Sequence, residues 1–571
     1  MAQPIRRTST VTESPRMVAV IDIGATSVRM AIAEIRSGGE VRTLDTLVQS
    51  VDLGRDVFES RRLSRKSIEK AASVLKQYQR VLREYGITSG SDVRVVATSA
   101  VREASNRLAF TDRIFVVTGL NVEQLEEAEV NRITYMGVMP HLKAQKGLAN
   151  GKSIVVEVGG GSTELLVVRG GNVLHSQSYR LGSLRLLKTL ESGRITTLRR
   201  RTILSSHIAR TLVQIAEQVN ADKGIQLVAI GGDIRFAAHR LLKDWDGVSL
   251  AKLPTSDLVN FTDEVLSLDE DAIVKRFGAS FIEAETLVPA LLAYSMLAQH
   301  FDLKEVFVCE TNLRDGLLND MAVGGSWTGE FRNQIVRSAI SLGRKFDFDE
   351  MHARNVAELS RKLFSQLSAD HQLDNRYEVI LYIASLLHEI GMLINVRSNH
   401  KHALYIIRNS DLFGLSKSQL LEVGLVARYY RRASPQSSHD EYGSLPREAR
   451  VAVAKMAAIL RLATALDDTR SGRIREIECG HEGKKLIINV PGVDDVSLEQ
   501  IAMRQNAGLF RDVFGCQSCC VLVTPNAHRR EFTELAVENR VSGLGLRSMG
   551  RHRLSGSHTA KGLARLVHTD V

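Results

Sequence analysis

Apolar residues follow two different spacings along this chain, and the spacing changes near residue 330. Before that point, short β-branched runs end in glycine-bearing turns, which predicts strands at 17–35 (as a pair), 41–51, 93–98, 153–158, 164–168 and 226–230. A helix is expected at 64–85, where Ile68, Ala72, Leu75 and Val81 recur at helical spacing. Beyond residue 330 we expect helices at 353–367, 377–387, 402–407, 417–430 and 449–466, then strands at 474–478, 484–490 and 519–523.

The change of spacing divides the chain into several domains, because 571 residues are too many for one hydrophobic core. Gly324-Gly325-Ser326 is the expected linker between the two halves. The tail is rich in Arg, Ser, Gly and His, and we expect it to be poorly ordered. The expected parts are two similar strand-rich lobes at 17–150 and 151–322, a helical domain at 330–470, a small α+β domain at 471–545 and the basic tail at 546–571.

Charge and cysteine content narrow the partners and the compartment. A net charge of +10 favours polyanionic partners, but the basic residues are spread along the chain and predict no specific nucleic-acid site. Five cysteines, an odd number, argue against a disulfide framework, and Cys516, Cys519 and Cys520 lack the second pair that a tetrahedral metal site requires. No uncharged apolar run approaches the roughly 18 residues that span a membrane, so we expect a cytoplasmic protein.

Two glycine-bearing turns, one in each expected lobe, have the same layout. Each follows an apolar run that carries one carboxylate, Asp22 in the first and Glu157 in the second, and a second apolar run returns after it. Glycine lets backbone N–H groups approach an anion, hydroxyls add donors, and the acid is suited to hold a cation beside a phosphate. The expected phosphate ligands in these turns are Gly24, Thr26, Ser27, Gly159, Gly160, Gly161, Ser162 and Thr163.

The two turns therefore predict two half-sites that face one cleft and bind a phosphoanhydride. Glu164 starts the returning run of the second turn and is a candidate catalytic carboxylate. The alternative is that these glycines only form tight hairpins. Their recurrence, together with Gly231-Gly232 after another strand, disfavours that alternative.

Five blocks of sequence resemble the exopolyphosphatase / guanosine pentaphosphate phosphohydrolase family in order and spacing, over about residues 17–525. The blocks are Asp22–Ser27, Ala97–Arg102 with Asn106, Val158–Glu164, Leu181–Leu186 and Asn312–Leu318. The resemblance implies an α/β fold with a two-lobed actin-like (ribonuclease H-like) N-terminal half and a helical domain of the His-Asp type behind it. It also implies Mg²⁺-dependent removal of terminal phosphate from polyphosphate or guanosine pentaphosphate, and a homodimer.

The chain departs from the family pattern at the position of the general base. The family carries a glutamate there, whereas alignment on Tyr135-Met-Gly-Val138 places Val130 at this position, and valine cannot take a proton. Glu126, Glu127 and Glu129 lie within one helical turn and are the candidate replacements. Their alternative role is an acidic, solvated helix face.

Three arginines inside or beside the matching blocks are candidates for an anion path, because a guanidinium fork matches phosphate oxygens. We expect Arg102 and Arg314 to bind phosphate. For Arg185, anion binding and a surface ion pair are both open.

The helical domain resembles metal-dependent phosphohydrolases in the histidines that it carries: His352, His388-Glu389, His400 and His402. Glu389 stands where such domains have aspartate, and Thr464 stands where they have the closing aspartate. We therefore expect these histidines to have a structural or polyanion-guiding role, not to form a second hydrolytic metal centre.

These expectations lead to a phosphoanhydride hydrolase that acts on inorganic polyphosphate, with guanosine pentaphosphate as a further substrate. Asp22 and Glu157 would hold Mg²⁺, and a glutamate at 126, 127 or 129 would be the base. The alternative, favoured by Val130, is a non-catalytic sensor of polyphosphate or a guanosine alarmone. A kinase on the same scaffold is less well supported, since no nucleoside-binding signature appears beyond Gly231-Gly232.

Overall fold

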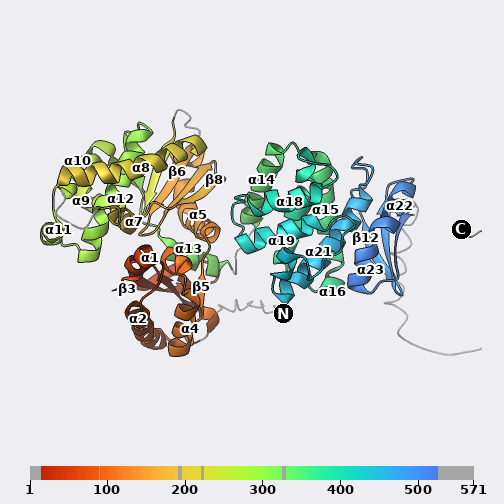
Figure 1. Ribbon diagram of the computed structural model, residues 1–571, viewed down its shortest axis with the longest axis horizontal. Coiled ribbons are helices and arrows are strands. Elements are labelled where there is room, and N and C mark those ends of the chain that lie inside the picture. The colour runs from red at the N-terminus through yellow and green to blue at the C-terminus, as the bar shows by residue number, and fades with distance from the viewer. Residues whose placement is uncertain (1–14, 89, 191–195, 220–223, 324–328, 525–571) are drawn as a thin grey trace, which may run out of the picture.

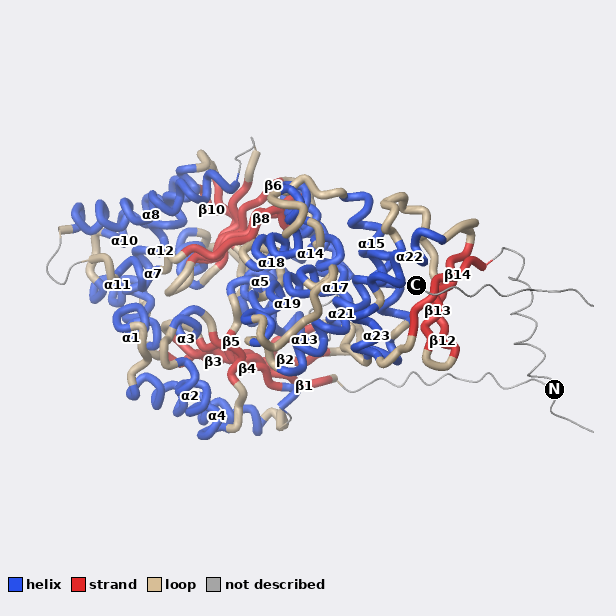
Figure 2. The backbone as a smooth tube through the Cα atoms, turned by 45° about the vertical axis from the view of Figure 1, so that its right-hand side comes forward, coloured by secondary structure: helices blue, strands red, loops and turns tan. Residues whose placement is uncertain are grey.

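The computed structural model describes residues 15–88, 90–190, 196–219, 224–323 and 329–524 (Figure 1). The expected linker at 324–326 and the basic tail at 546–571 lie outside these residues, as does the end of the expected α+β domain. The chain forms two α/β lobes, then a bundle of helices, then a small sheet at the far end. Figure 2 shows the three sheets in red, with the helical bundle between the lobes and the third sheet.

The first lobe is built on a five-stranded sheet with the order β3-β2-β1-β4-β5. The first three strands are antiparallel, and β4 and β5 run parallel to β1. Alternate residues of β1 enter different cores: Ala19, Ile21 and Ile23 pack toward α2 and α4, whereas Val18 and Val20 pack toward α13. The elements are β1 (Arg16–Ile23), β2 (Ser27–Ile35), β3 (Val41–Ser50), α1 (Leu53–Ser60), α2 (Arg65–Glu84), β4 (Val93–Ala97), α3 (Ser99–Glu103), α4 (Arg107–Thr118) and β5 (Val122–Gln124).

The second lobe repeats this plan with a six-stranded sheet, in the order β10-β11-β9-β6-β7-β8. Here β6 pairs antiparallel with β7 and parallel with β9, as β1 pairs with β2 and β4. One sheet face packs against α8, α10 and α12. The elements are β6 (Lys152–Val158), β7 (Thr163–Arg169), β8 (Asn172–Tyr179), α7 (Ser183–Leu187), α8 (Thr197–Val219), β9 (Gln226–Ile230), α9 (Gly232–Leu241), β10 (Ala251–Pro254), α10 (Thr255–Leu266), α11 (Glu270–Phe277), α12 (Phe281–His300) and β11 (Glu305–Val308).

One helix of the second lobe has an unusually apolar composition. Among the described helices, α12 is long and apolar enough to cross a membrane by length and composition. However, 72% of its apolar window is buried, and Leu287, Leu291 and Tyr294 lie in the core of the second lobe. Its apolar residues are therefore used in packing.

Two helices connect the lobes, so the packing does not divide at residue 150. Helix α5 (Glu127–Ala144) places Val130 and Ile133 against the first sheet, and Tyr135 and Met139 in the core that lies against the second. Helix α13 (Leu313–Ala322) follows the second lobe in sequence but packs on β1 of the first. A Cβ atom on Gly316 would lie 2.3 Å from the carbonyl oxygen of Ile133, so glycine is needed for this close crossing.

The helical domain contains the five helices that its spacing predicts. They are α15 (Glu350–Gln366), α17 (Arg376–Leu387), α18 (Asn399–Arg408), α19 (Lys417–Arg428) and α21 (Arg447–Leu466), and α14 (Gly329–Lys345) precedes them. Short α6 (Lys146–Ala149), α16 (Ser368–His371) and α20 (Asp440–Gly443) lie in connecting segments.

The last described segment is a three-stranded sheet with two helices. Its elements are β12 (Glu478–Glu482), β13 (Lys485–Pro491), α22 (Ser497–Asn506), α23 (Gly508–Phe514) and β14 (Ser518–Thr524). The strand expected at 474–478 is wrong, because the first strand begins only at Glu478. Ile474 and Ile477 are buried, but they anchor an irregular segment in the core and pair with no strand.

Candidate active site

The two glycine-bearing turns have the same backbone structure. The N–H of Gly24 donates to the carbonyl of Ser27, and the N–H of Gly159 donates to the carbonyl of Ser162, each at 2.9 Å. Within the described residues, the next amides, of Ala25, Thr26, Gly160, Gly161 and Ser162, donate to no protein acceptor. Each turn therefore presents a group of N–H donors, which is the arrangement that binds anions.

The turns lie against each other between the lobes. A Cβ atom on Gly160 would lie 3.1 Å from the Cβ of Ala25, so the turns are at van der Waals distance across the lobe boundary. Both border one cavity of about 230 Å³. Of the expected site residues, those that line this cavity are Asp22, Gly24, Thr26, Ser27, Arg102, Glu157, Gly159, Gly160, Ser162 and Glu164.

Three expected phosphate ligands are not brought to the cavity. Gly161 packs against Phe58, where a Cβ atom would clash with the ring. The hydroxyl of Thr163 donates to the carbonyl of Leu181. Arg314 lies behind Asp22, with its Nη1 3.8 Å from Asp22 Oδ2. These residues shape the site from outside its lining.

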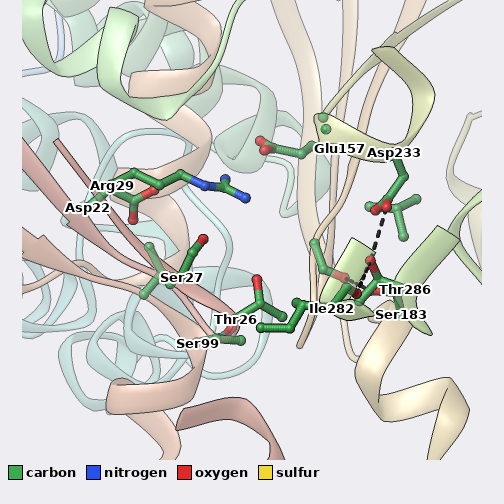
Figure 3. Close-up of a pocket in the computed structure, with 18 of the residues that line it drawn as sticks. Asp22, Thr26, Ser27, Arg29, Ser99, Glu157, Ser183, Asp233, Ile282 and Thr286 are labelled. Atoms are coloured by element: carbon green, nitrogen blue, oxygen red, sulfur yellow. Dashed lines mark hydrogen bonds between the residues drawn. The ribbon is translucent and has the colours of Figure 1, made fainter. Parts of the chain in front are cut away.

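The two acids of the turns lie on opposite walls of the cleft, Asp22 from β1 and Glu157 from β6 (Figure 3). Burial raises the pKa of both carboxyl groups, and the nearby charge of Asp22 raises the pKa of Glu157 further. The Oδ1 atom of Asp22 is buried and has no hydrogen-bond partner in the described structure. The buried Asp22, with its unpartnered oxygen, and the half-buried Glu157 are a donor set that suits a hard divalent cation such as Mg²⁺.

Arg29 and Asp233 also line the cleft, although the sequence had not indicated either as a site residue. Arg29 is paired directly with Asp22 across β1 and β2, and its side chain extends toward the opposite wall (Figure 3). Arg29 forms no ion pair among the described residues, so its guanidinium is available to an anion in the cleft. Asp233 accepts a hydrogen bond from Thr286, and burial raises its pKa to about 6.

Glu164 has the properties of a proton acceptor near neutral pH. Its Oε1 accepts hydrogen bonds from Ser162 (2.8 Å) and Ser178 (3.0 Å), which fix the carboxyl group at the cleft. Burial raises its pKa to about 7, despite these hydrogen bonds and the charge of Arg102. Its Oε2 is buried and has no partner in the described part of the chain.

The helix that carries the family's base position brings no carboxylate into the cleft. Val130 lines the cavity. Glu126 Oε2 accepts the backbone N–H of Lys417 at 2.5 Å, and Glu129 accepts the N–H of Glu126 at 3.3 Å. Glu127 lines a neighbouring cavity of about 740 Å³, and its Oε1 lies 3.8 Å from Arg102 Nη2. The expected role of Glu127 or Glu129 as a base in the cleft is thus not supported by their positions.

The candidate arginines have different surroundings. Arg102 lines the cleft, and its Nη1 donates to the carbonyl of Leu125 at 2.7 Å. Arg185 donates from Nε to the carbonyl of Gly161 (2.9 Å) and from Nη2 to Glu103 of the first lobe (2.7 Å). Arg185 therefore supports the second turn and links the lobes by an ion pair. Of the two roles left open for it, the ion pair agrees with the structure and anion binding does not.

The fold and the cleft define a class of protein: two lobes with repeated strand-turn-strand hairpins whose anion-binding turns and acids enclose one site. The model of the Ppx/GppA phosphatase family matches residues 31–323, and the model of Ppx/GppA phosphatase domain III matches residues 336–505. The chain belongs to the Ppx/GppA phosphatase family, and its two-lobed half has the actin-like fold.

Individual relatives agree with this assignment. The chain is 25% identical over 491 residues to a guanosine-5'-triphosphate,3'-diphosphate pyrophosphatase of Vibrio parahaemolyticus, which covers 84% of this chain and 92% of the relative. A protein of the same name from Aliivibrio fischeri is 26% identical over 465 residues, covering 80% and 88%. The crystal structure of an exopolyphosphatase from Cytophaga hutchinsonii is similar with a TM-score of 0.50 and 20% identity, covering 55% of this chain and 99% of that one.

Proposed function

We propose that the chain hydrolyses terminal phosphoanhydride bonds, with inorganic polyphosphate as substrate and guanosine pentaphosphate as a second one. The observation that carries this proposal is the contact between the two donor turns, which places their free N–H groups and the carboxylates of Asp22, Glu157 and Glu164 around one cavity. A chain of phosphates in this cavity would meet donors from both lobes at once.

Arg29 and Arg102 supply the positive side chains of the cleft. Their guanidinium groups would neutralise the charge that develops on the phosphoryl oxygens. Asp22 and Glu157 would hold Mg²⁺, which when bound supplies further neutralisation of these oxygens. The hydroxyls of Thr26, Ser27 and Ser162 would complete the hydrogen bonds to the phosphates.

Glu164 is the residue that we assign as general base. With Val130 at the family's base position, a proton acceptor must come from another element, and Glu164 reaches the cleft from β7. Its pKa of about 7 keeps a substantial ionised fraction at neutral pH while leaving the carboxylate basic enough to accept a proton from water. The unpartnered Oε2 is the acceptor atom.

A non-catalytic sensor is the second candidate function, and Val130 in the lining of the cleft is the observation that favours it. Loss of a general base costs about 10²- to 10⁴-fold in rate, so binding and turnover must be measured separately. We would measure polyphosphate binding by calorimetry and phosphate release in Mg²⁺ on the same preparation, for wild type, Glu164→Gln and Glu127→Gln.

The two candidates predict different results. The hydrolase releases phosphate, loses this activity in Glu164→Gln and retains it within a few-fold in Glu127→Gln, while all three proteins bind. Binding without release by the wild type would reject the hydrolase and support the sensor.

A further inference from the structure

A second polar cluster lies in the helical domain, outside the cleft between the lobes. His352 comes from α15, and His388 and Glu389 follow the end of α17. One possible ligand atom from each residue lies within 4.8 Å of the others. The three residues line a cavity of about 660 Å³, which gives a ligand access to them.

Both imidazole rings are oriented by partners behind them. Nδ1 of His388 lies 2.7 Å from the carbonyl oxygen of Ser385. Because a carbonyl only accepts, this Nδ1 carries the proton and Nε2 has the lone pair. Nδ1 of His352 lies 2.7 Å from Asp467 Oδ2, and the other oxygen of Asp467 accepts the N–H of Gly472. A carboxylate or carbonyl behind a histidine is the usual support of a metal ligand.

The atoms of the cluster that could bind a ligand, Nε2 of both histidines and the Glu389 carboxylate, form no hydrogen bonds with one another. Nε2 of His388 is buried and has no partner among the described residues, and the His388 side chain is fully buried. Nε2 of His352 lies 4.0 Å from Glu389 Oε2, which is too far for a hydrogen bond. Two atoms bound to one metal with bonds of about 2.1 Å are about 3.4 Å apart in a tetrahedral site and at most about 4.2 Å apart, so a separation of 4.0 Å leaves room for a cation between them. A buried acceptor without a donor is costly unless a cation binds there.

We propose that His352, His388 and Glu389 bind one divalent first-row transition cation of the Zn²⁺, Mn²⁺ or Co²⁺ class. Two imidazoles and one carboxylate favour such ions over Mg²⁺, which prefers oxygen ligands. Three protein ligands leave at least one coordination position open to the cavity.

Asp467 positions the ring of His352, and it lies near Thr464, which stands where domains of the His-Asp type have a ligating aspartate. It lies one helical turn later and contacts His352, whereas Thr464 lines the cavity and bonds to the carbonyl of Arg461. A carboxylate is thus present at this end of the cluster, but it orients the ligand His352 and does not itself bind the cation.

Arg470 pairs with Glu389 and also with Asp349. Because Asp349 provides a second acidic partner, Glu389 does not have to keep both of its oxygens on Arg470. Arg470 donates to both oxygens of Glu389, at 2.9 and 2.7 Å, and its Nη1 lies 3.4 Å from Asp349 Oδ2. One Glu389 oxygen could turn to the metal while Arg470 keeps the other oxygen and Asp349. A carboxylate accepts several bonds, so the ion pair and the metal bond are compatible.

The test uses the full chain with Asp22→Asn, which weakens the cation set of the cleft. After loading with Co²⁺ and desalting, the bound metal is measured by mass spectrometry and by its visible absorption. We expect about one equivalent per chain, at least a tenfold loss of affinity in His388→Gln and Glu389→Gln, and a loss of about 10- to 100-fold in Asp467→Asn.

His439→Gln is the matched control, because His439 is in the same domain but contacts Tyr429 outside the cluster. It should bind cobalt like the parent. Equal cobalt binding by the parent and Glu389→Gln, or no retained metal in the parent, would overturn the proposal. Circular dichroism checks folding, and Glu389→Gln decides the test if His388→Gln does not fold.

Discussion

Arg29 on β2 is the direct cross-strand partner of Asp22 on β1. The equivalent pair in the second lobe is Glu164 on β7 and Glu157 on β6. The same hairpin thus carries an acid and a cation in the first lobe, and two acids in the second. This difference assigns different tasks to the lobes. The first supplies charge neutralisation, and the second supplies the proposed base.

Glu164→Gln should reduce phosphate release about 10²- to 10⁴-fold, because glutamine keeps the shape and cannot accept the proton. Initial rates at saturating polyphosphate measure this effect. Glu69→Gln is a matched control, since Glu69 pairs with Arg113 on the surface of the first lobe, outside the cavity. A Glu164→Gln rate within threefold of the wild type would show that the base is another residue.

The rate should rise with pH through about 7, because only the ionised carboxylate of Glu164 accepts a proton and its pKa is raised to about 7. The effect on stability has the opposite sign. Between 4.5 and about 7 the folded chain holds a proton that the unfolded chain has released, so this group's contribution to stability falls as pH rises. The pH profile of kcat and denaturant unfolding across this range, each compared with Glu164→Gln, measure both effects. A Glu164→Gln variant with an unchanged acidic limb would contradict the assignment.

Arg29→Gln should lower kcat/KM about 10- to 100-fold, because a charge-assisted hydrogen bond contributes about 1.5–3 kcal/mol. Arg29→Lys should recover part of this loss, since it restores the charge but not the fork. Steady-state kinetics with polyphosphate provide the measurement, with Arg36→Gln as the control because Arg36 pairs with Glu34 near the surface. Full activity in Arg29→Gln would remove Arg29 from the site.

Val130→Glu should raise the rate, because it places a carboxylate in the lining of the cleft where the family has its base. Val130→Gln, which has the same size and no basic oxygen, separates proton transfer from a change in shape. Phosphate release by the two variants under the same conditions is compared. Equal rates would indicate that a base at this position has no role in this chain.

The hairpins and helices could be predicted from the sequence because their signals are local. Alternating apolar residues and the glycines at 24 and 159 define both turns without reference to the rest of the chain. Arg29 lies seven residues after Asp22, as Glu164 lies seven after Glu157, and comparison of the two hairpins would have found it.

Other features depend on packing between distant segments. Helix α13 returns to the first lobe because its apolar face fits the far side of β1, and no local pattern indicates which sheet it covers. Arg185 was ambiguous because Glu103, its partner, lies on the other lobe. Asp467 was missed because it lies three residues beyond the position that the family pattern marks, at the end of α21.

The most direct test of the central claim is a ³¹P NMR time course of long-chain polyphosphate with the wild-type protein and Mg²⁺. The account predicts that orthophosphate appears while internal phosphate decreases, and that no intermediate short chains accumulate at the start, because phosphate is removed from the ends. A spectrum that stays unchanged while polyphosphate is bound would contradict it.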